Sequence, residues 1–306
     1  MPHRVITLGE IMLRLSTPGF ERFINTRSYD VIYGGAEANV AISLANWGES
    51  ATHVTVFPNN DIGKAATNTL RFAGVDTSHV HFNEGRMGIY FVENGAMQRS
   101  SKIIYDRFDS AFSNLNPDDF DWEKIFEGAD WFHWTGITPA VSQAAADLCL
   151  AAVKAASKLG VKISADINYR RNLWQYGKGP MDIMPKLIEP SHLIIAGLTD
   201  FENCMGITET DYLQACEKAK TICPSLRYVS TTHRDSISAS ENDLNGILWN
   251  GQAMLESKTY EMTHIVDRIG GGDAYMAGLI YGLLHMEDQQ ALDFAVAASV
   301  LKHSVP

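Results

Sequence analysis

Short apolar runs and amphipathic runs alternate along the chain, and they predict strands and helices in turn. Residues 5–8 form an apolar run that ends at Gly9, and residues 11–15 alternate apolar with polar positions, as strands do. Residues 36–47 carry apolar side chains at helical spacing and are followed by Gly48, a typical helix stop. The opening of the chain therefore predicts strands followed by a helix.

The same alternation of strand and helix patterns continues to the end of the chain. It predicts strands at 54–57, 131–134, 161–166, 192–196 and 227–230, and helices at 62–73, 142–159, 211–220 and 276–284. Strands separated by helices pair in parallel through right-handed crossovers. We therefore expect an α/β fold with a mostly parallel central sheet, and a ligand site at the carboxyl ends of its strands.

One stretch interrupts this alternation. Residues 87–108 are rich in aromatic and β-branched side chains, and the sequence Glu93-Asn94-Gly95-Ala96 is a strong hairpin-turn signal. We expect antiparallel strands here, and a small β-sheet lid built from about 11–33 and 87–109. The chain has no repeat and no long linker, so residues 1–306 are expected to form a single α/β domain with this lid.

Charge and cysteine content narrow the class of protein. The net charge of −11 argues against nucleic acid and membrane partners, because both need clustered cations. No Cys-x-x-Cys pair occurs, and the N-terminus has no apolar stretch long enough for a signal peptide. We expect a cytoplasmic protein that acts on small molecules, with buried thiols at its four cysteines, Cys149, Cys204, Cys216 and Cys223.

The sharpest chemical signal is the turn Gly270-Gly271-Gly272-Asp273 before a helix. Glycines let backbone N–H groups point inward, and a helix N-terminus carries partial positive charge, so this turn suits phosphate oxygens. Asp273 could accept the proton of a hydroxyl that attacks phosphorus. Alternatively, the glycines form an ordinary tight loop and Asp273 is the helix N-cap.

A second glycine turn, Gly34-Gly35, opens the helix that contains Asn39. With the first turn, it resembles the two signatures of the ribokinase (PfkB) family of sugar kinases. The resemblance implies a three-layer α/β/α sandwich. It also implies that Gly34, Gly35 and Asn39 approach a sugar, while Gly270, Gly271, Gly272 and Asp273 form the catalytic anion hole.

A third set of residues resembles the branch of this family that phosphorylates 2-keto-3-deoxygluconate, a sugar acid. The resemblance implies a substrate site at Glu10, Tyr90, Tyr105, Arg107, Asn168 and Arg170. Arginine binds a carboxylate through two parallel N–H donors, so Arg107 and Arg170 suit a carboxylate clamp. Taken singly, the arginines are also typical of surface ion pairs, and the tyrosines of lid packing.

The nucleotide side departs from the family pattern. The resemblance implies ATP, Mg²⁺, an optional monovalent cation, and nucleotide contacts at Asp200, Thr231, Arg234, Asp267, Gly270 and Gly272. Relatives often have Asn-x-x-Glu where this chain has Gly197 to Asp200, so Asp200 is expected to act on the metal only through water. Relatives also usually extend further at the C-terminus, so part of the pocket edge is expected to be absent.

The resulting hypothesis is a kinase that transfers the γ-phosphoryl group of ATP to the 6-hydroxyl of 2-keto-3-deoxygluconate. One alternative is a kinase of the same family for fructose, ribose or a nucleoside. Another is a non-catalytic sugar-acid-binding relative. An exposed lid edge also predicts a homo-oligomer formed through the lid.

Overall fold

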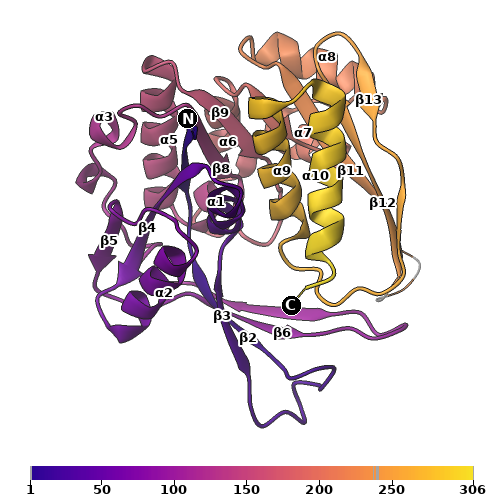
Figure 1. The fold of residues 1–306 in the computed structure, drawn as a ribbon. Coiled ribbons are helices and arrows are strands. Elements are labelled where there is room, and N and C mark those ends of the chain that lie inside the picture. The colour runs from indigo at the N-terminus through magenta and orange to yellow at the C-terminus, as the bar shows by residue number, and fades with distance from the viewer. Residues whose placement is uncertain (1, 237, 239–240, 306) are drawn as a thin grey trace.

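The computed structural model describes residues 2–236, 238 and 241–305, and its largest element is a twisted, mostly parallel sheet (Figure 1). In the described residues this sheet has ten strands, in the order β13-β12-β11-β10-β9-β8-β1-β4-β5, with β14 paired to β12. The strands β11, β10, β9, β8, β1, β4 and β5 pair in parallel, whereas β12 pairs antiparallel with β11, β13 and β14. Their bounds are Arg4–Leu8 (β1), Ser50–Pro58 (β4), Val80–Asn83 (β5), Trp131–Thr135 (β8), Lys162–Asp166 (β9), Leu193–Ile195 (β10), Tyr228–Ser236 (β11), Asn242–Trp249 (β12), Met254–Glu256 (β13) and Tyr260–Met262 (β14).

Helices cover both faces of the sheet, each with its own apolar core. One face packs against α3 (Trp122–Ile125), α5 (Gln143–Lys158), α6 (Pro180–Ile188), α7 (Leu198–Met205) and α8 (Tyr212–Ile222). The other packs against α1 (Ala36–Asn46), α2 (Asp61–Phe72), α9 (Gly271–His285) and α10 (Asp288–Lys302). A short helix, α4 (Ile137–Val141), and a 3₁₀ turn (Pro117–Asp119) complete the helical segments. The predicted three-layer α/β/α sandwich is confirmed.

Helices α9 and α10 pack at unusually close range because α9 carries glycines on the shared face. A Cβ on Gly278 would lie 2.8 Å from the Cα of Ala295, and one on Gly282 would lie 2.5 Å from the Cα of Ala291. Both partners on α10 are alanines, the smallest side chains with good helix propensity. Near the site described below, the hydroxyl of Ser299 on α10 donates to the carbonyl oxygen of Gly271 at 2.9 Å and so joins the last turns of α10 to the start of α9.

The lid is a separate four-stranded sheet in the order β3-β2-β6-β7. Its strands are β2 (Met12–Ser16), β3 (Asp30–Gly34), β6 (Ile89–Glu93) and β7 (Lys102–Asp106). It extends below the carboxyl ends of the parallel strands (Figure 1). The β6–β7 pair is antiparallel as predicted, whereas β2 and β6, which join the two segments, pair in parallel.

The predicted hairpin turn at Asn94-Gly95 is wrong by three residues. The β6–β7 register continues through the bridge between Ala96 and Arg99, so the chain reverses at Met97 and Gln98. Met97 takes a φ of 52°, the left-handed conformation that such a turn needs. The Asn-Gly pair lies instead in the arm of the hairpin.

Several elements of the fold are absent from the sequence prediction. They are α3, α4, α6, α7, α10, β5, β12, β13 and β14. Pro185 inside α6 is a helix-breaking signal, and small residues on both faces of α10 weaken its amphipathic pattern. In the described part of the chain, the search for a helix long and apolar enough to cross a membrane finds none.

Candidate active site

The two glycine turns, far apart in sequence, meet between the lid and the core. The Nδ2 of Asn39 on α1 donates a 2.7 Å hydrogen bond to Oδ2 of Asp273 on α9, across 234 positions. Residues Gly34 and Gly270 line the same hollow as Asn39, with a volume of about 260 Å³. The structure thus brings together the sugar-side and phosphate-side residues that the sequence predicted separately.

Asp273 is a half-buried carboxylate with a perturbed pKa. Gly270, with a φ of 86°, is the N-cap of α9, and Asp273 lies at the third helical position, so it is not the N-cap. Burial raises the pKa of Asp273 to about 6, while the Asn39 hydrogen bond and the positive charges of Lys302 and Arg170 act in the opposite direction. The carboxylate is therefore mostly ionised at neutral pH and still able to accept a proton.

Close approaches explain the glycines of the two turns. A Cβ on Gly35 would overlap the carbonyl oxygen of Glu10, and one on Gly271 would overlap the ring of His303. At Gly272, in contrast, a Cβ would meet nothing within 4 Å. The N-terminus of α9, where the first N–H groups have no carbonyl one turn earlier, therefore faces open space.

A buried ion pair joins the lid to the turn before α9. Arg14 on β2 places Nη1 2.5 Å from Oδ2 of Asp267, and both side chains are buried. The other oxygen of Asp267 accepts the N–H of Ile269 at 2.9 Å, and Lys302 lies 3.9 Å away. Asp267 therefore already has two cationic partners, and it links the lid strand β2 to the glycine turn.

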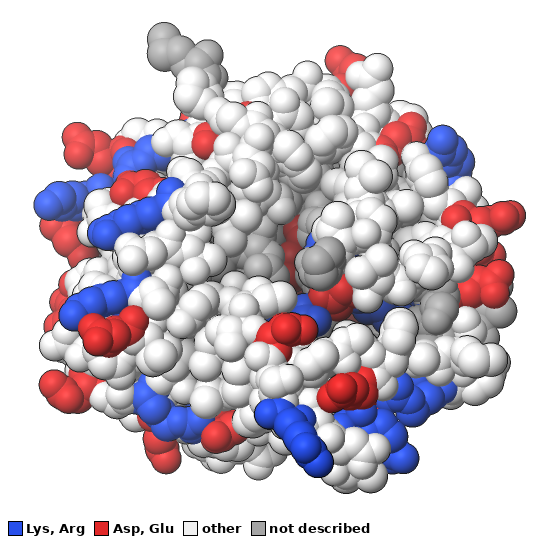
Figure 2. All heavy atoms as spheres, turned by 60° about the horizontal axis from the view of Figure 1, so that its bottom comes forward, with Lys and Arg blue, Asp and Glu red and all other residues white. Residues whose placement is uncertain are grey.

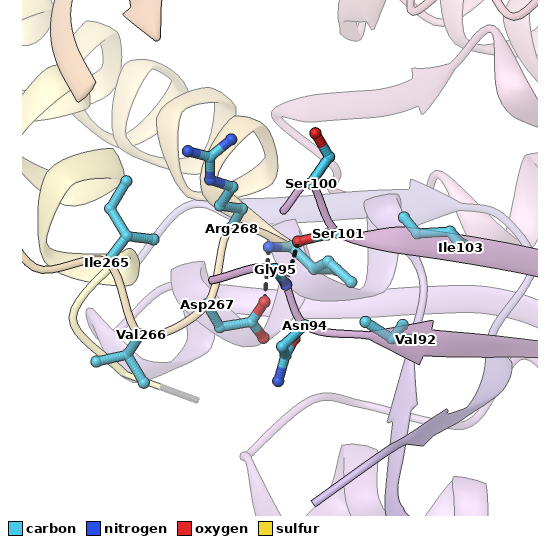
Figure 3. A pocket seen from close by; sticks show the side chains of 11 residues that line it. Val92, Asn94, Gly95, Ser100, Ser101, Ile103, Ile265, Val266, Asp267 and Arg268 are labelled. Atoms are coloured by element: carbon cyan, nitrogen blue, oxygen red, sulfur yellow. Dashed lines mark hydrogen bonds between the residues drawn. The ribbon is translucent and has the colours of Figure 1, made fainter. Parts of the chain in front are cut away.

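Hollows surround this ion pair on the lid side of the molecule. Figure 2 shows the largest depression of this side, with acidic and basic atoms in its depth. Arg14 lines the 260 Å³ hollow, and Asp267 lines one of about 310 Å³ and one of about 490 Å³. In the 310 Å³ hollow, Ile265 and Val266 form one wall and Asn94 and Ser101 of the lid form the other (Figure 3).

Arg107 is buried and already paired. Its Nε and Nη2 both donate to Oε2 of Glu10, with the Nε contact at 3.0 Å, and Ser110 donates to Oε1 at 2.6 Å. A Cβ on Gly88 would lie 2.7 Å from Oε1 of Glu10, so this pair also fills the space beside the lid strand. The charge of Arg107 is thus balanced within the protein.

The two predicted tyrosines stack on each other within the lid. The rings of Tyr90 on β6 and Tyr105 on β7 lie 6.0 Å apart, with Tyr90 buried and Tyr105 half exposed. Burial raises the pKa of Tyr90 to about 12, and the charges of Arg14 and Asp273 also act on it. Tyr90 lines the 260 Å³ hollow, and its hydroxyl would lie 3.7 Å from a Cβ on Gly34, beside the first glycine turn.

The predicted Asn168 and Arg170 follow directly on β9, whose last residue is Asp166. Asn168 takes a left-handed φ of 41° and contacts Asp166 at 3.4 Å. Arg170 is exposed, and its charge acts on both Asp166 and Asp273. Burial, then the negative charges of Asp200 and Asp273, raise the pKa of Asp166 to about 8. Asp166 is a site residue that the sequence prediction missed, although its position at a strand end was a usable signal.

Both carboxylate oxygens of Asp200 accept hydrogen bonds from the backbone. Its Oδ2 accepts the N–H of Gly197 at 2.7 Å, and its Oδ1 accepts that of Tyr169 at 2.9 Å. It thereby caps α7 and holds the loop after β9. Within the described residues, no group of three or more His, Cys, Asp or Glu side chains is arranged to hold a metal ion.

Positive side chains gather beside the N-terminus of α9, on the predicted nucleotide side. Burial lowers the pKa of His303, and the charges of Arg234, Lys302 and Arg268 lower it further. Thr231 lies on β11, the strand that also carries Arg234, and its hydroxyl oxygen is near Gly197. Arg14, Arg268 and Lys302 were not assigned from the sequence, because nothing in their spacing shows that they converge.

A buried glutamate supports the start of α1. Oε1 of Glu37 accepts hydrogen bonds from the backbone and hydroxyl of Thr135 at 3.1 and 2.8 Å, and from Thr138 at 2.6 Å. Burial raises its pKa to about 7. A Cβ on Gly9 would overlap the Glu37 carboxyl group. Glu37 therefore joins α1 to the carboxyl ends of β1 and β8.

Comparisons with known proteins agree with this site. The sequence pattern of the pfkB family carbohydrate kinases matches residues 3–305. The crystal structure of 2-dehydro-3-deoxygluconokinase from Thermotoga maritima is 42% identical, with a TM-score of 0.94 over 99% of this chain and 94% of that chain. The 2-dehydro-3-deoxygalactonokinase of Haloferax volcanii is 29% identical over 100% of this chain and 92% of its own. The 2-dehydro-3-deoxygluconokinase of Thermoproteus tenax is 28% identical over 97% of this chain and 87% of its own. The chain belongs to the pfkB family of carbohydrate kinases.

Proposed function

We propose that this kinase transfers the γ-phosphoryl group of ATP to the 6-hydroxyl of 2-keto-3-deoxygluconate, also called 2-dehydro-3-deoxygluconate. The observation that carries the proposal is the hydrogen bond between Asn39 and Asp273, which joins the two glycine turns in one site. The names of the relatives from Thermotoga maritima and Thermoproteus tenax support the substrate class.

Asp273 is the proton acceptor in this proposal. With a pKa raised to about 6 by burial, it is ionised at neutral pH and takes the proton as the sugar oxygen attacks phosphorus. The N–H groups at the start of α9 face open space at Gly272 and would stabilise the charge on the transferring phosphoryl group. Catalysis then depends mainly on positioning and electrostatics.

ATP is the second substrate, and its phosphates suit the positive side chains beside α9. Arg234, Arg268 and Lys302 would balance its negative charge, alongside Thr231. Mg²⁺ bound to the phosphates would neutralise charge as the phosphoryl group moves. Asp200 supplies a carboxylate near this position. Asp166, whose pKa is raised to about 8, would become ionised beside the positive charge of the metal. Both suit contact with metal-bound water, because no described cluster forms a protein cage. The monovalent cation stays a prediction.

Arg170 is the proposed partner of the sugar-acid carboxylate. It is exposed beside Asp166 and Asp273, and the described residues include no direct ion pair to its side chain. Arg107, in contrast, is neutralised by Glu10 and would orient the lid strands beside the sugar. We therefore assign the clamp to Arg170, with Arg107 as its support. Closure of the lid would exclude water, which would otherwise hydrolyse ATP.

A coupled ADP-release assay over a panel of sugars tests the proposal. The panel contains 2-keto-3-deoxygluconate, its C4 epimer, fructose, ribose and a nucleoside. We expect the highest kcat/KM with one of the two sugar acids. Turnover only with a neutral sugar would refute the proposed substrate, while the assignment of the protein as a kinase would stand. Binding of the sugar acid in calorimetry, without turnover of any compound, would favour a non-catalytic relative.

A further inference from the structure

A second hollow lies at the opposite edge of the central sheet from the lid. It has a volume of about 490 Å³, within the usual range for small-molecule sites. Trp131, Lys162 and Tyr228, the first residues of β8, β9 and β11, line it. The starts of these parallel strands lie at the end of the molecule where the chain begins, away from the lid (Figure 1). The hollow is therefore separate from the active site.

The hollow contains positive charges without counter-ions. Lys162 has its Nζ 5.6 Å from the ring centroid of Trp131, and Arg227 is exposed on the rim. Within the described residues, neither side chain makes an ion pair or a side-chain hydrogen bond to an acid. The chain has a net charge of −11, so two unpaired cations that face one hollow make the local electrostatic potential positive on a protein that is negative as a whole.

His192 adds a donor to this set. Its Nδ1 accepts the N–H of Ile163 at 3.2 Å, so the neutral ring carries its proton on Nε2. Burial lowers the pKa of His192, and the charges of Lys162, Arg227 and Lys220 lower it further. The cations therefore lie close enough to the imidazole to repel its own positive charge, and an anion bound among them would relieve that repulsion.

The one carboxylate that lines the hollow is already satisfied. Oδ1 of Asp288 accepts the Tyr228 hydroxyl at 3.1 Å, and Oδ2 accepts Nδ2 of Asn250 at 2.8 Å. Among the described lining residues no other acid is present. Asp288 therefore holds the wall of the hollow together and leaves Lys162 and Arg227 free to bind an anion.

We propose that Lys162, Arg227 and His192 form a second binding site, for a small metabolite with two or more carboxylate or phosphate groups. The two cations would contact the anionic groups, and His192 would donate through Nε2. Trp131 and Tyr228 form the apolar wall. The strands and helices that line this site end at the active site: β9 at Asp166, and α10 at Lys302.

Isothermal calorimetry with two probes tests the proposal. Pyrophosphate represents a phosphate ligand, citrate represents a carboxylate ligand, and both are titrated in the presence of a saturating ATP analogue, which occupies the active site, and without Mg²⁺, which both probes would chelate. The test variant is Lys162→Gln/Arg227→Gln. The matched control is Lys258→Gln/Lys154→Gln, which removes the same charge and includes Lys258, a lysine that also lies over an aromatic ring, 4.6 Å from the Tyr260 centroid.

We expect at least one probe to bind the wild type with a stoichiometry of one. The Kd should rise at least tenfold in the test variant and change less than twofold in the control. Preference for one probe identifies the anionic group of the ligand. Absence of binding by both probes, or equal weakening in the two variants, would overturn the proposal. Circular dichroism confirms that both variants are folded.

Discussion

At the scale of single residues, the site depends on one hydrogen bond that sets the charge of Asp273. Asn39 donates to the carboxylate at 2.7 Å and so lowers a pKa that burial has raised. Because a protonated Asp273 cannot accept a proton, we expect kcat/KM to fall as the pH drops below about 6, the raised pKa of this carboxylate. This fall is the acid limb of the pH profile. Asn39 thus helps to keep Asp273 ionised at neutral pH, together with the positive charges of Lys302 and Arg170.

Replacing Asn39 should move this acid limb. In Asn39→Ala the carboxylate loses a charge-assisted hydrogen bond, so the acid limb of kcat/KM should shift to higher pH by about one unit. Ser43→Ala is the control, because Ser43 lines the same hollow and bonds only to the backbone oxygen of Asn39. An unchanged limb in Asn39→Ala, or an equal shift in the control, would show that the hydrogen bond does not set this pKa.

Arg170 is the second residue whose role can be isolated. Loss of its guanidinium in Arg170→Ala should lower kcat/KM for the sugar acid by roughly ten- to a thousand-fold, because charge-assisted bonds to the carboxylate disappear. The rate with a neutral sugar should change little. Arg171→Ala is the matched control, an exposed arginine one position away. Equal losses for acid and neutral sugars would argue against a carboxylate clamp.

At the scale of elements, four neighbouring strands carry a row of buried polar residues. His53, Thr7, His133 and Ser164 occupy successive registers of β4, β1, β8 and β9. His53 contacts Thr7 at 2.7 Å and His133 contacts Ser164 at 2.9 Å, while the Nε2 atoms of both histidines are buried without a partner. Burial lowers the pKa of each histidine to about 3, so both stay neutral in the fold.

These histidines should make the fold sensitive to acid. Between pH 6.5 and 3 the unfolded chain binds protons at both positions and the folded chain does not, so stability falls as the pH falls. Each histidine contributes a loss of about 2 kcal/mol between pH 7 and 5. Urea unfolding should show this loss reduced in His133→Gln and retained in His233→Gln, an exposed control. An identical pH dependence in both variants would contradict the assignment.

Local signals account for most of what the sequence predicted. Alternation of apolar runs located the strands around Leu8 and Trp134, and a glycine turn located the start of α1, because these features depend on neighbouring residues. Helix α9, in contrast, begins at Gly271, five residues before the predicted start at residue 276, so most of the predicted glycine turn lies inside the helix. The contacts of Arg14 with Asp267 and of Arg107 with Glu10 span 253 and 97 positions. Their side chains meet only through the tertiary fold, so the spacing of residues could not reveal them.

At the scale of the whole molecule, the lid presents apolar side chains to solvent along its two outer strands. Val31 and Ile32 on β3 and Ile103, Ile104 and Tyr105 on β7 are between 39% and 57% exposed, on the outer strands of one small sheet. Exposed apolar side chains on both outer strands favour association, and unpaired strand edges add to it. The lid is therefore the surface through which we expect two copies to associate.

Light scattering after size exclusion tests this association. The wild type should elute as an oligomer at micromolar concentration, and Ile104→Asp should elute as a monomer, because a charge on the lid face would be buried unpaired. Phe72→Asp is the control, since Phe72 is 97% exposed on α2, away from the lid. A monomeric wild type, or dissociation in both variants, would contradict association through the lid.

The central claim is that Asp273 accepts the proton of the substrate hydroxyl at the junction of lid and core. The measurement that tests it most directly is ADP release by Asp273→Asn with 2-keto-3-deoxygluconate, beside calorimetric binding of the same sugar acid. Asp293→Asn on α10 is the control. We predict a loss of kcat of about 10²- to 10⁴-fold in Asp273→Asn, with the sugar Kd changed less than threefold. Retention of kcat by this variant would contradict the account.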